Sequence, residues 1–510
     1  MTDQTSPNSL NEKASLTTNE VDVVPSAEKS TAIAERKLVR KLDLRLLPVL
    51  TMLYLLSFLD RSNIGNAKLD GLTTDLKMKQ SQYLNVLTMY FFGYVLFEIP
   101  SNIVLKRLTP RLWLPTLMVV WGIVSTLMGL VHNYSGLMAV VRVYSTILSW
   151  GFSPTVIVDA QRFFLGATEA GLFPGVVYYL SCWYKRKEQH FRISIFFSAA
   201  SLAGAFGGVL AFGIGKMAGI GHKSGWSWIF IIEGLATIVL ASLSYLFVHN
   251  YPDTVSFLSP AEKTLLHDRL RDDNDALNGE VFAWKYVKIA FQDVAVWLYC
   301  FCFMGCSLPL YTLSLFMPTI IADLGYSAAK AQLLTVPPYF VATVLTFGTA
   351  WGSHLINRRA PFMIAGAVLA IIGYIILITD RRTGVQYFAT FLCAGGIYPA
   401  TAITLSWPAN NVSGQLKRAV ACAMQISIGN IGAIIGTQLY RYAPRFYLGH
   451  GFAIGSLSML TVFTCINWAV LARRNKEKEE TLSGKHEDPQ LEKDSRLHLG
   501  DAHPSWKFQL

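Results

Sequence analysis

LLPVLTMLYLLSFLDRSNIGNA, residues 46–67, is the stretch that decides the fold class. It is apolar enough to cross a bilayer, yet it holds Asp60 and Arg61 side by side. A charged side chain at the centre of a membrane helix costs about 2.5 kcal/mol or more, so such residues usually mark a path for a substrate or for protons. Arg162 and Glu169 open a second stretch of this kind. The two pairs predict a membrane protein with a charged interior pathway.

The composition of the whole chain agrees with a membrane protein. Apolar residues make up 52% of the 510 residues and charged residues only 15%, whereas soluble proteins carry about 25% charged residues. Hydropathy predicts an all-α integral membrane protein with 12 transmembrane helices. The apolar segments are 46–67, 83–103, 112–131, 162–183, 193–215, 227–249, 292–318, 332–355, 360–379, 384–405, 419–441 and 452–472.

The twelve segments fall into two sets of six, on either side of a polar run. Two six-helix bundles joined by a linker are typical of proteins built from internal repeats, with the site between the halves. Both terminal stretches are polar without apolar periodicity, so we expect disorder there. The expected parts are a cytosolic N-terminal tail at 1–39, an N-terminal bundle at 40–249, a cytosolic linker at 250–291, a C-terminal bundle at 292–473 and a cytosolic C-terminal tail at 474–510.

Basic residues in short loops set the predicted orientation. Alternate loops carry pairs such as Lys106 with Arg107 and Lys417 with Arg418, which places these loops and both termini in the cytosol. The opposite loops also carry basic residues, Lys77 among them, so the bias is moderate. The formal net charge of +11 is explained by these flanking residues and not by a surface that binds nucleic acid.

Catalytic motifs are not found in the sequence. It holds no zinc-protease helix, phosphate-binding glycine loop or nucleophile elbow, which disfavours an enzyme and an ATP-driven pump. Cys300, Cys302 and Cys306 invite a metal interpretation, but no His accompanies them, and packing is favoured. We expect no cofactor and no metal.

Five groups of residues resemble a known family. They resemble the signatures of the anion:cation symporter family of the major facilitator superfamily, and within it the fungal allantoate and nicotinate permease branch. The resemblance covers about residues 40–475. It implies a monomeric, proton-coupled carrier of a small organic anion, a carboxylate such as nicotinate or allantoate, in the lipid bilayer of the plasma membrane. The groups are LDRSNIGNA at 59–67, FEIPSN at 97–102, RFFLGATEAG at 162–171, Trp226 with Ile229, Phe230, Glu233 and Gly234, and Trp407 with Asn410, Asn411, Gly414, Lys417 and Arg418.

Arg61 and Arg162 are the candidate residues for holding an anionic substrate, because a guanidinium stays charged when buried and offers a planar fork to a carboxylate. Asp60 and Glu169 are the candidate proton-coupling residues. Asp60 adjoins Arg61, and Glu169 lies two turns from Arg162 on the same helix face. Substrate at the arginine would change the charge beside the carboxyl group and thus its proton affinity. The alternative is a pair of structural salt bridges, which are costly to keep for stability alone.

Other polar residues carry weaker signals. Tyr90 and Tyr94 share a helix face and could offer hydroxyls to a substrate, although packing explains them equally well. Asn410 and Asn411 resemble cavity residues of the family, or they cap a helix end. Asn357 stands where the superfamily usually has an aspartate, which weakens a charge relay in the second half. The candidate gating residues in predicted cytosolic turns are Lys106, Arg107, Asn357 and Arg358.

Three functions fit this set of charges. The first is uptake of a small carboxylate with protons, and the second is proton-driven export of a metabolite, which the same fold supports. The third is a non-transporting membrane sensor, which would not need the full set of charges. The sequence does not separate import from export.

Residues 141–161 interrupt the expected fourth span. Joining Val140 to Arg162 gives one continuous helix over 137–183 that matches the family pattern, whereas the intervening residues match nothing in it. The segment begins with Val, codable with an initial GT, and ends with Gln, codable as CAG, so it is compatible with a retained intron. The alternative is an insertion in an outer loop, with the helix starting at Arg162. Such a loop would expose an unusual apolar patch.

Overall fold

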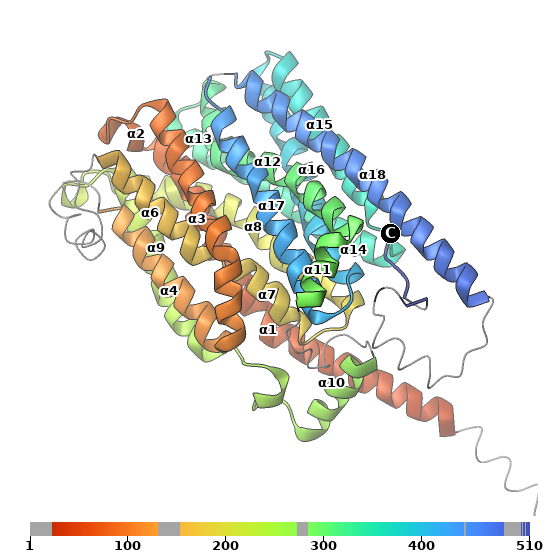
Figure 1. Ribbon diagram of the computed structural model, residues 1–510. Helices are drawn as coiled ribbons and strands as arrows, with labels where there is room; N and C mark the ends of the chain where they lie inside the picture. The colour runs from red at the N-terminus through yellow and green to blue at the C-terminus, as the bar shows by residue number, and fades with distance from the viewer. Residues whose placement is uncertain are drawn as a thin grey trace, which may run out of the picture.

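The computed structural model describes residues 23–130, 154–272, 284–442 and 445–483, together with residues 501, 503, 504 and 506–510. All regular structure in this part of the chain is helical (Figure 1). Twelve helical stretches are long and apolar enough to cross a membrane, which confirms the predicted all-α membrane fold.

The helices form two six-helix bundles that lie side by side (Figure 1). The first bundle contains α1 (Val23–Leu69), α3 (Gln80–Arg107), α4 (Pro110–Met128), α6 (Pro154–Glu169) with α7 (Leu172–Ser181), α8 (Arg186–Gly215) and α9 (Gly225–Phe247). The second contains α12 (Val294–Asp323), α13 (Ala328–Leu334) with α14 (Val336–Ile356), α15 (Ala360–Thr379), α16 (Thr383–Asn411), α17 (Gln415–Leu439) and α18 (Tyr447–Ser483). Short helices connect these elements: α2 (Leu72–Asp75), α10 (Pro260–Asp272), α11 (Trp284–Gln292), and the 3-10 turns Ile220–His222 and Pro252–Thr254.

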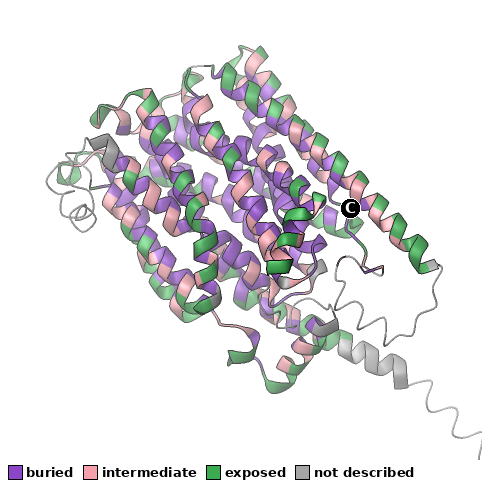
Figure 2. Cartoon of the chain, viewed as in Figure 1, coloured by how far each residue is buried: buried purple, intermediate pink, exposed green. Residues whose placement is uncertain are grey.

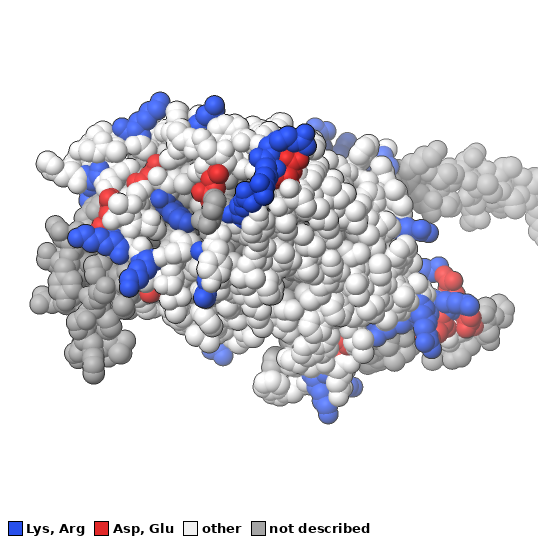
Figure 3. Space-filling model, turned by 90° about the horizontal axis from the view of Figure 1, so that it is seen from above, with Lys and Arg blue, Asp and Glu red and all other residues white. Residues whose placement is uncertain are grey.

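Contacts between the bundles define the central interface. There α8 packs against α14 and α16, α3 against α17, and α1 against α12. Buried residues line the faces where helices meet (Figure 2). Large apolar side chains such as Leu96, Leu246 and Phe340 are exposed on the outside, as expected for a surface that faces hydrocarbon. Figure 3 shows a broad uncharged area between the charged side chains.

We call the end of the molecule that carries α10 the linker end. Helix α10 begins with a capping box, in which Ser259 and Glu262 exchange backbone and side-chain hydrogen bonds of 2.8 and 3.2 Å. Lys41 of α1 also donates to Glu262 at 2.9 Å. These hydrogen bonds, with that of Lys41 the largest contribution, lower the pKa of the Glu262 carboxyl group.

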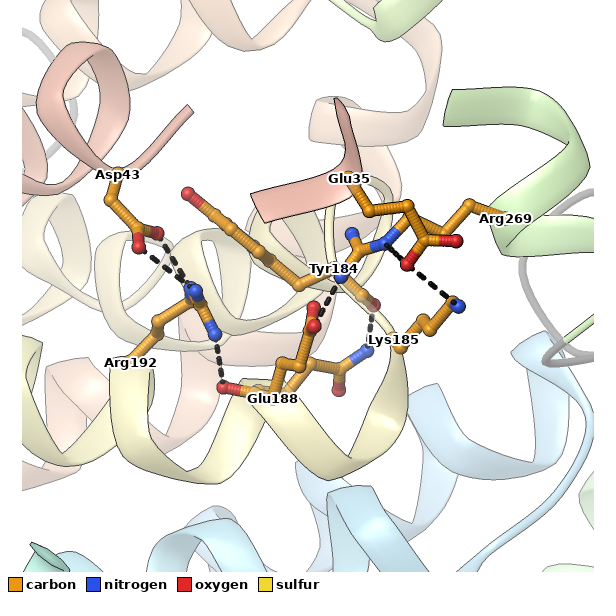
Figure 4. A network of polar contacts seen from close by, with 8 residues as sticks. Glu35, Asp43, Tyr184, Lys185, Glu188, Arg192 and Arg269 are labelled. Carbon is orange, nitrogen blue, oxygen red and sulfur yellow. Dashed lines mark hydrogen bonds and ion pairs between the residues drawn. The ribbon is translucent and has the colours of Figure 1, made fainter. Parts of the chain in front are cut away.

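Ion pairs join α10 to the first bundle at the linker end (Figure 4). Arg269 of α10 is buried and pairs with Glu188 at the start of α8 and with Glu35 of α1, the latter at 3.4 Å. Beside it, Arg192 pairs with Asp43 through two bonds of 2.6 and 2.9 Å. The first half of the linker is therefore fixed to the first bundle.

The structure corrects the expectation of disordered tails. Helix α1 already begins at Val23, and α18 continues to Ser483, where ion pairs such as Arg473 with Glu477 at 2.8 Å support it. Residues 506–510 pack into the second bundle, and Gln509 exchanges hydrogen bonds with Asn411. Polar composition alone missed the packing of residues 506–510, because it depends on Asn411, a partner distant in sequence. Residues 1–22 and 484–500 lie outside the described part.

The structure also corrects the start of the fourth span. Residues 141–153 lie outside the described part, but residues 154–161 are helical and form the first turns of α6. Val158 and Gln161 are buried there. The helix therefore does not start at Arg162, because the preceding residues have their own packing partners.

Candidate functional site

Arg61 stands at the meeting point of the two bundles. It is 3% exposed, and its NH2 group pairs with Glu169 Oε1 of α6 at 2.6 Å. Its NH1 group donates to the hydroxyl of Tyr311, on α12 of the other bundle, at 3.0 Å. The rings of Tyr90, Tyr94 and Tyr311 each lie 5.3 Å from the guanidinium carbon. One buried cation thus contacts both halves of the protein.

Close helix crossing brings Tyr90 and Glu169 together. Gly93 of α3 faces the main-chain oxygen of Phe163, and Gly166 of α6 faces that of Tyr90. A side chain at either glycine would collide with the opposite backbone, so only glycine permits this approach. As a result the Tyr90 hydroxyl donates to Glu169 Oε2 at 2.5 Å. The carboxylate of Glu169 also accepts a hydrogen bond from Ser57.

Asp60 points away from Arg61. Its carboxylate accepts hydrogen bonds from Trp121 at 3.0 Å, Ser125 at 3.2 Å and Thr237 at 2.9 Å, which come from α4 and α9. All these donors are neutral, and Asp60 is 1% exposed. The expected pairing of Asp60 with Arg61 is therefore not present, and Asp60 belongs to a separate polar site within the first bundle.

Arg162 also lacks the expected partner. Its side chain is buried, and its NH2 group donates to Asn63 at 3.4 Å, while Glu169 is engaged by Arg61. Asn63 in turn donates to Glu233 Oε2 at 3.2 Å. Glu233 was not among the candidate site residues. An acidic residue within an apolar span was the available signal for it.

The second bundle places Asn410 and Asn411 near the linker end of α16. Asn411 donates to the Tyr299 hydroxyl at 3.0 Å, and both side-chain polar atoms of the buried Asn410 are without hydrogen-bond partners among the described residues. An unsatisfied buried amide is costly, so Asn410 is a candidate for contact with a polar ligand.

The candidate gating residues lie at the linker end. Arg107 and Arg358 are exposed, and Asn357 ends α14 in the left-handed conformation with φ 55°. The side chain of Lys106 lies outside the described part. Sequence reasoning missed Arg359, which is 2% exposed and donates to Gln509.

A cavity lies between the bundles at the linker end, below the Arg61 site. Residues of α3, α7, α16 and α17 line it, together with Gln189 at the start of α8. Among the lining residues are Asn102, Val177, Ala409, Cys422 and Ala423. At the opposite end the bundles are joined, as by the 2.8 Å contact of Thr88 with Thr437. The bundles thus touch at the opposite end, while the described cavity lies near the linker end.

Comparison with known proteins now decides the family. Residues 50–437 match the family model described as Major Facilitator Superfamily. The chain belongs to the major facilitator superfamily. Members of this superfamily are membrane transporters and not enzymes, so the protein is a multi-pass membrane transporter of small molecules.

Fungal members of the superfamily are similar over most of the chain. The MFS-type transporter cnsO of Penicillium expansum is 37% identical, covering 87% of this chain and 85% of its own length. The uncharacterized transporter C1002.16c of Schizosaccharomyces pombe is 33% identical, covering 90% and 89%. Among solved structures, the partially occluded inward-open form of the xylose transporter XylE from E. coli is similar with a TM-score of 0.62 and 13% identity, covering 84% of this chain and 97% of XylE. That similarity concerns the major facilitator fold alone.

Proposed function

We propose that this transporter carries a small organic anion, a carboxylate such as nicotinate or allantoate, together with a proton. The observation that carries the proposal is the buried pair of Arg61 and Glu169 at the contact between the bundles. Arg61 is the group that would hold the carboxylate of the substrate, and Glu169 occupies it when the substrate is absent.

Charge balance explains why proton and anion would travel together. The empty site holds one positive and one negative charge. A proton on Glu169 frees the fork of Arg61, and an anion then restores neutrality, so the loaded site has the same net charge as the empty one. Binding either species alone would leave an uncompensated charge in a buried site, which is strongly unfavourable. Coupling therefore follows from the arrangement of two residues.

The remaining candidates have supporting roles in this proposal. Arg162, Asn63 and Glu233 form a second polar group behind the site, and Asp60 is a second acid that could exchange protons. Tyr90 and Tyr94 would contact the substrate at Arg61, and Asn410, nearer the linker end, would contact it on its way between Arg61 and that end. The linker end would face the cytosol, with both termini inside and the monomer in the plasma membrane. The same cycle run in reverse would export an anion.

A transport screen tests the proposal. Cells that express the full chain and matched cells that lack it would be given radiolabelled nicotinate, allantoate or pantothenate at two external pH values. We expect uptake of at least one carboxylate that is faster at the lower pH and that a protonophore abolishes. Uptake of none of them would overturn the proposal, and so would uptake that depends neither on pH nor on the protonophore. Preloaded cells in the same assay distinguish import from export.

A further inference from the structure

Glu98 is a buried acid that the proposed transport cycle does not use. It lies on α3 with 0% exposure, where α3 packs against α17 of the other bundle. Ser427 of α17 donates a hydrogen bond to its Oε2 at 3.0 Å, across the interface. Its Oε1 has no hydrogen-bond partner among the described residues. The hydrogen bond from Ser427 to Glu98 thus joins the two bundles through a carboxyl group.

No cation compensates a charge on Glu98 within the described part of the chain, where no ion pair involves it. A buried carboxylate with one hydrogen bond and no cation is so unfavourable that the group takes up a proton instead. Arg61, which lies against Tyr94 one turn from Glu98 on α3, is already paired with Glu169. Titratable or charged groups on α3 and on the elements packed around it include Tyr94 on α3, Tyr311 on α12, Arg162 and Glu169 on α6, Tyr178 on α7, and Cys422 and Arg418 on α17.

Glu98 lies between the Arg61 site and the cavity at the linker end. One turn toward the linker end, Asn102 donates to the main-chain oxygen of Glu98 at 2.8 Å and lines the cavity. On α17, Ala423 lines the cavity one turn from Ser427. One turn in the other direction along α3, Tyr94 lies against Arg61. The contact of Glu98 with Ser427 therefore lies between the cavity and the Arg61 site, and the bundles have to part there for the two to connect.

We propose that Glu98 releases a proton when the two bundles part at the linker end. We call the contact of Glu98 with Ser427 the linker-end gate. In the closed arrangement the carboxyl group is neutral and hydrogen-bonded to Ser427. When the bundles part at this end, that bond breaks and water from the cavity reaches the group. The O–H bond of the acid then breaks, its proton passes to water, and the carboxylate remains hydrated. Closure requires the reverse steps, with a proton taken from the same side. The inference rests on alternating access in this superfamily and not on the proposed anion.

Proton release makes the gate dependent on pH. Because the open state binds one proton fewer, its population relative to the closed state rises by up to about tenfold for each pH unit on the linker side. Acid on that side favours the closed gate. This regulation acts on the gate and is separate from the proton that travels with the substrate.

Cysteine accessibility tests the inference without a known substrate. Cys422 lines the cavity and is only 8% exposed, so its thiol is largely covered while α3 and α17 touch. Its alkylation by a small maleimide becomes faster when these helices part and therefore reports opening. The full chain and the Glu98→Gln variant, both in liposomes, would be labelled over a series of pH steps and read by peptide mass spectrometry. Because thiol ionisation affects both proteins equally, the ratio of wild-type to variant rates isolates Glu98. We expect this ratio to rise with pH, by up to about tenfold per unit.

The two possible roles of Glu98 predict different results. Glutamine keeps an oxygen that accepts from Ser427, so a purely structural role predicts the same pH response in both proteins, and that result would overturn the inference. The Ser427→Ala variant provides a second measurement, because it removes the bond and keeps the acid. We expect faster labelling of Cys422 with an unchanged pH response. Loss of the pH response in Ser427→Ala would likewise count against the inference.

Discussion

Arg61 is the residue on which the proposed site depends most. Its planar fork contacts Glu169 and Tyr311 from opposite bundles, at 2.6 and 3.0 Å. A lysine ammonium is a point charge and does not reproduce two parallel bonds to a carboxylate. We expect Arg61→Lys to reduce transport of the identified carboxylate about tenfold to a hundredfold, since a charged hydrogen-bonded contact is worth about 1.5–3 kcal/mol. Radiolabelled uptake, normalised to protein at the membrane, measures this loss.

A matched control for this substitution is Arg382→Lys. Arg382 pairs with Asp380 at 2.6 Å, but its side chain is 78% exposed. Transport should stay unchanged in that variant. Normal transport by Arg61→Lys would contradict the assignment of Arg61 as the anion-binding residue.

A substitution at Glu169 distinguishes proton coupling from substrate binding. The Glu169→Gln variant mimics the protonated acid, which leaves Arg61 free at every pH. We expect it to keep exchange of internal for external substrate and to lose accumulation driven by a proton gradient. Counterflow and net uptake in liposomes measure the two activities. Full accumulation in Glu169→Gln would remove Glu169 from the coupling step, and Asp60→Asn in the same assays then tests the other acid.

Residue types could be predicted from the sequence, but their pairings could not. The charges at 60, 61, 162 and 169 are all buried, as expected of intramembrane ionisable groups. Successive helical residues point about 100° apart, so Asp60 and Arg61 face different helices. Arg162 and Glu169 share a face but lie two turns apart, about 10 Å along the axis, which is too far for direct contact. Only the packing of other helices determines which partner each charge meets.

At the scale of elements, hydropathy was sufficient to place twelve spans but not their ends. Helices α1 and α18 extend well beyond the apolar segments, and the fourth span is divided between α6 and α7. The extension of α1, for example, is supported by the ion pair of Glu35 with Arg269, in which polar surfaces pack against each other. Hydropathy does not register such contacts.

Arg269 provides a test of the link between α10 and the first bundle. Its buried guanidinium pairs with Glu35 and Glu188, both about one-third exposed or less. We expect Arg269→Met to lower the free energy of unfolding by about 1–3 kcal/mol, because both carboxylates lose their charged partner. Thermal unfolding in detergent measures the change, with Arg473→Met as the control, since that pair is exposed. Equal stability of the two variants would show that α10 is not fixed by this contact.

Residues 141–161 lead to a prediction about helix α6. If they are a retained intron, the mature transcript lacks their codons and Val140 directly precedes Arg162, so that residues 137–140 would supply about one helical turn before Arg162. We expect the chain without residues 141–161 to transport at least as well as the full chain. Sequencing the transcript and measuring transport by both forms of the chain distinguish a retained intron from an insertion. A message that keeps these codons as its major form, or an inactive deletion form, would support a genuine insertion.

At the scale of the whole molecule, transport requires the two bundles to separate at one end while they close at the other. Thr88 of α3 and Thr437 of α17 touch at 2.8 Å at the end opposite the linker. Their hydroxyls are close enough for a pair of cysteines at these positions to be cross-linked. We expect the double variant Thr88→Cys with Thr437→Cys to lose transport after oxidation and to regain it with a reductant. Each single variant should transport under both conditions, which controls for reaction at the native cysteines. A cross-linked double variant with full transport would show that this end need not open, and alternating rocking of the two bundles would be wrong for this protein.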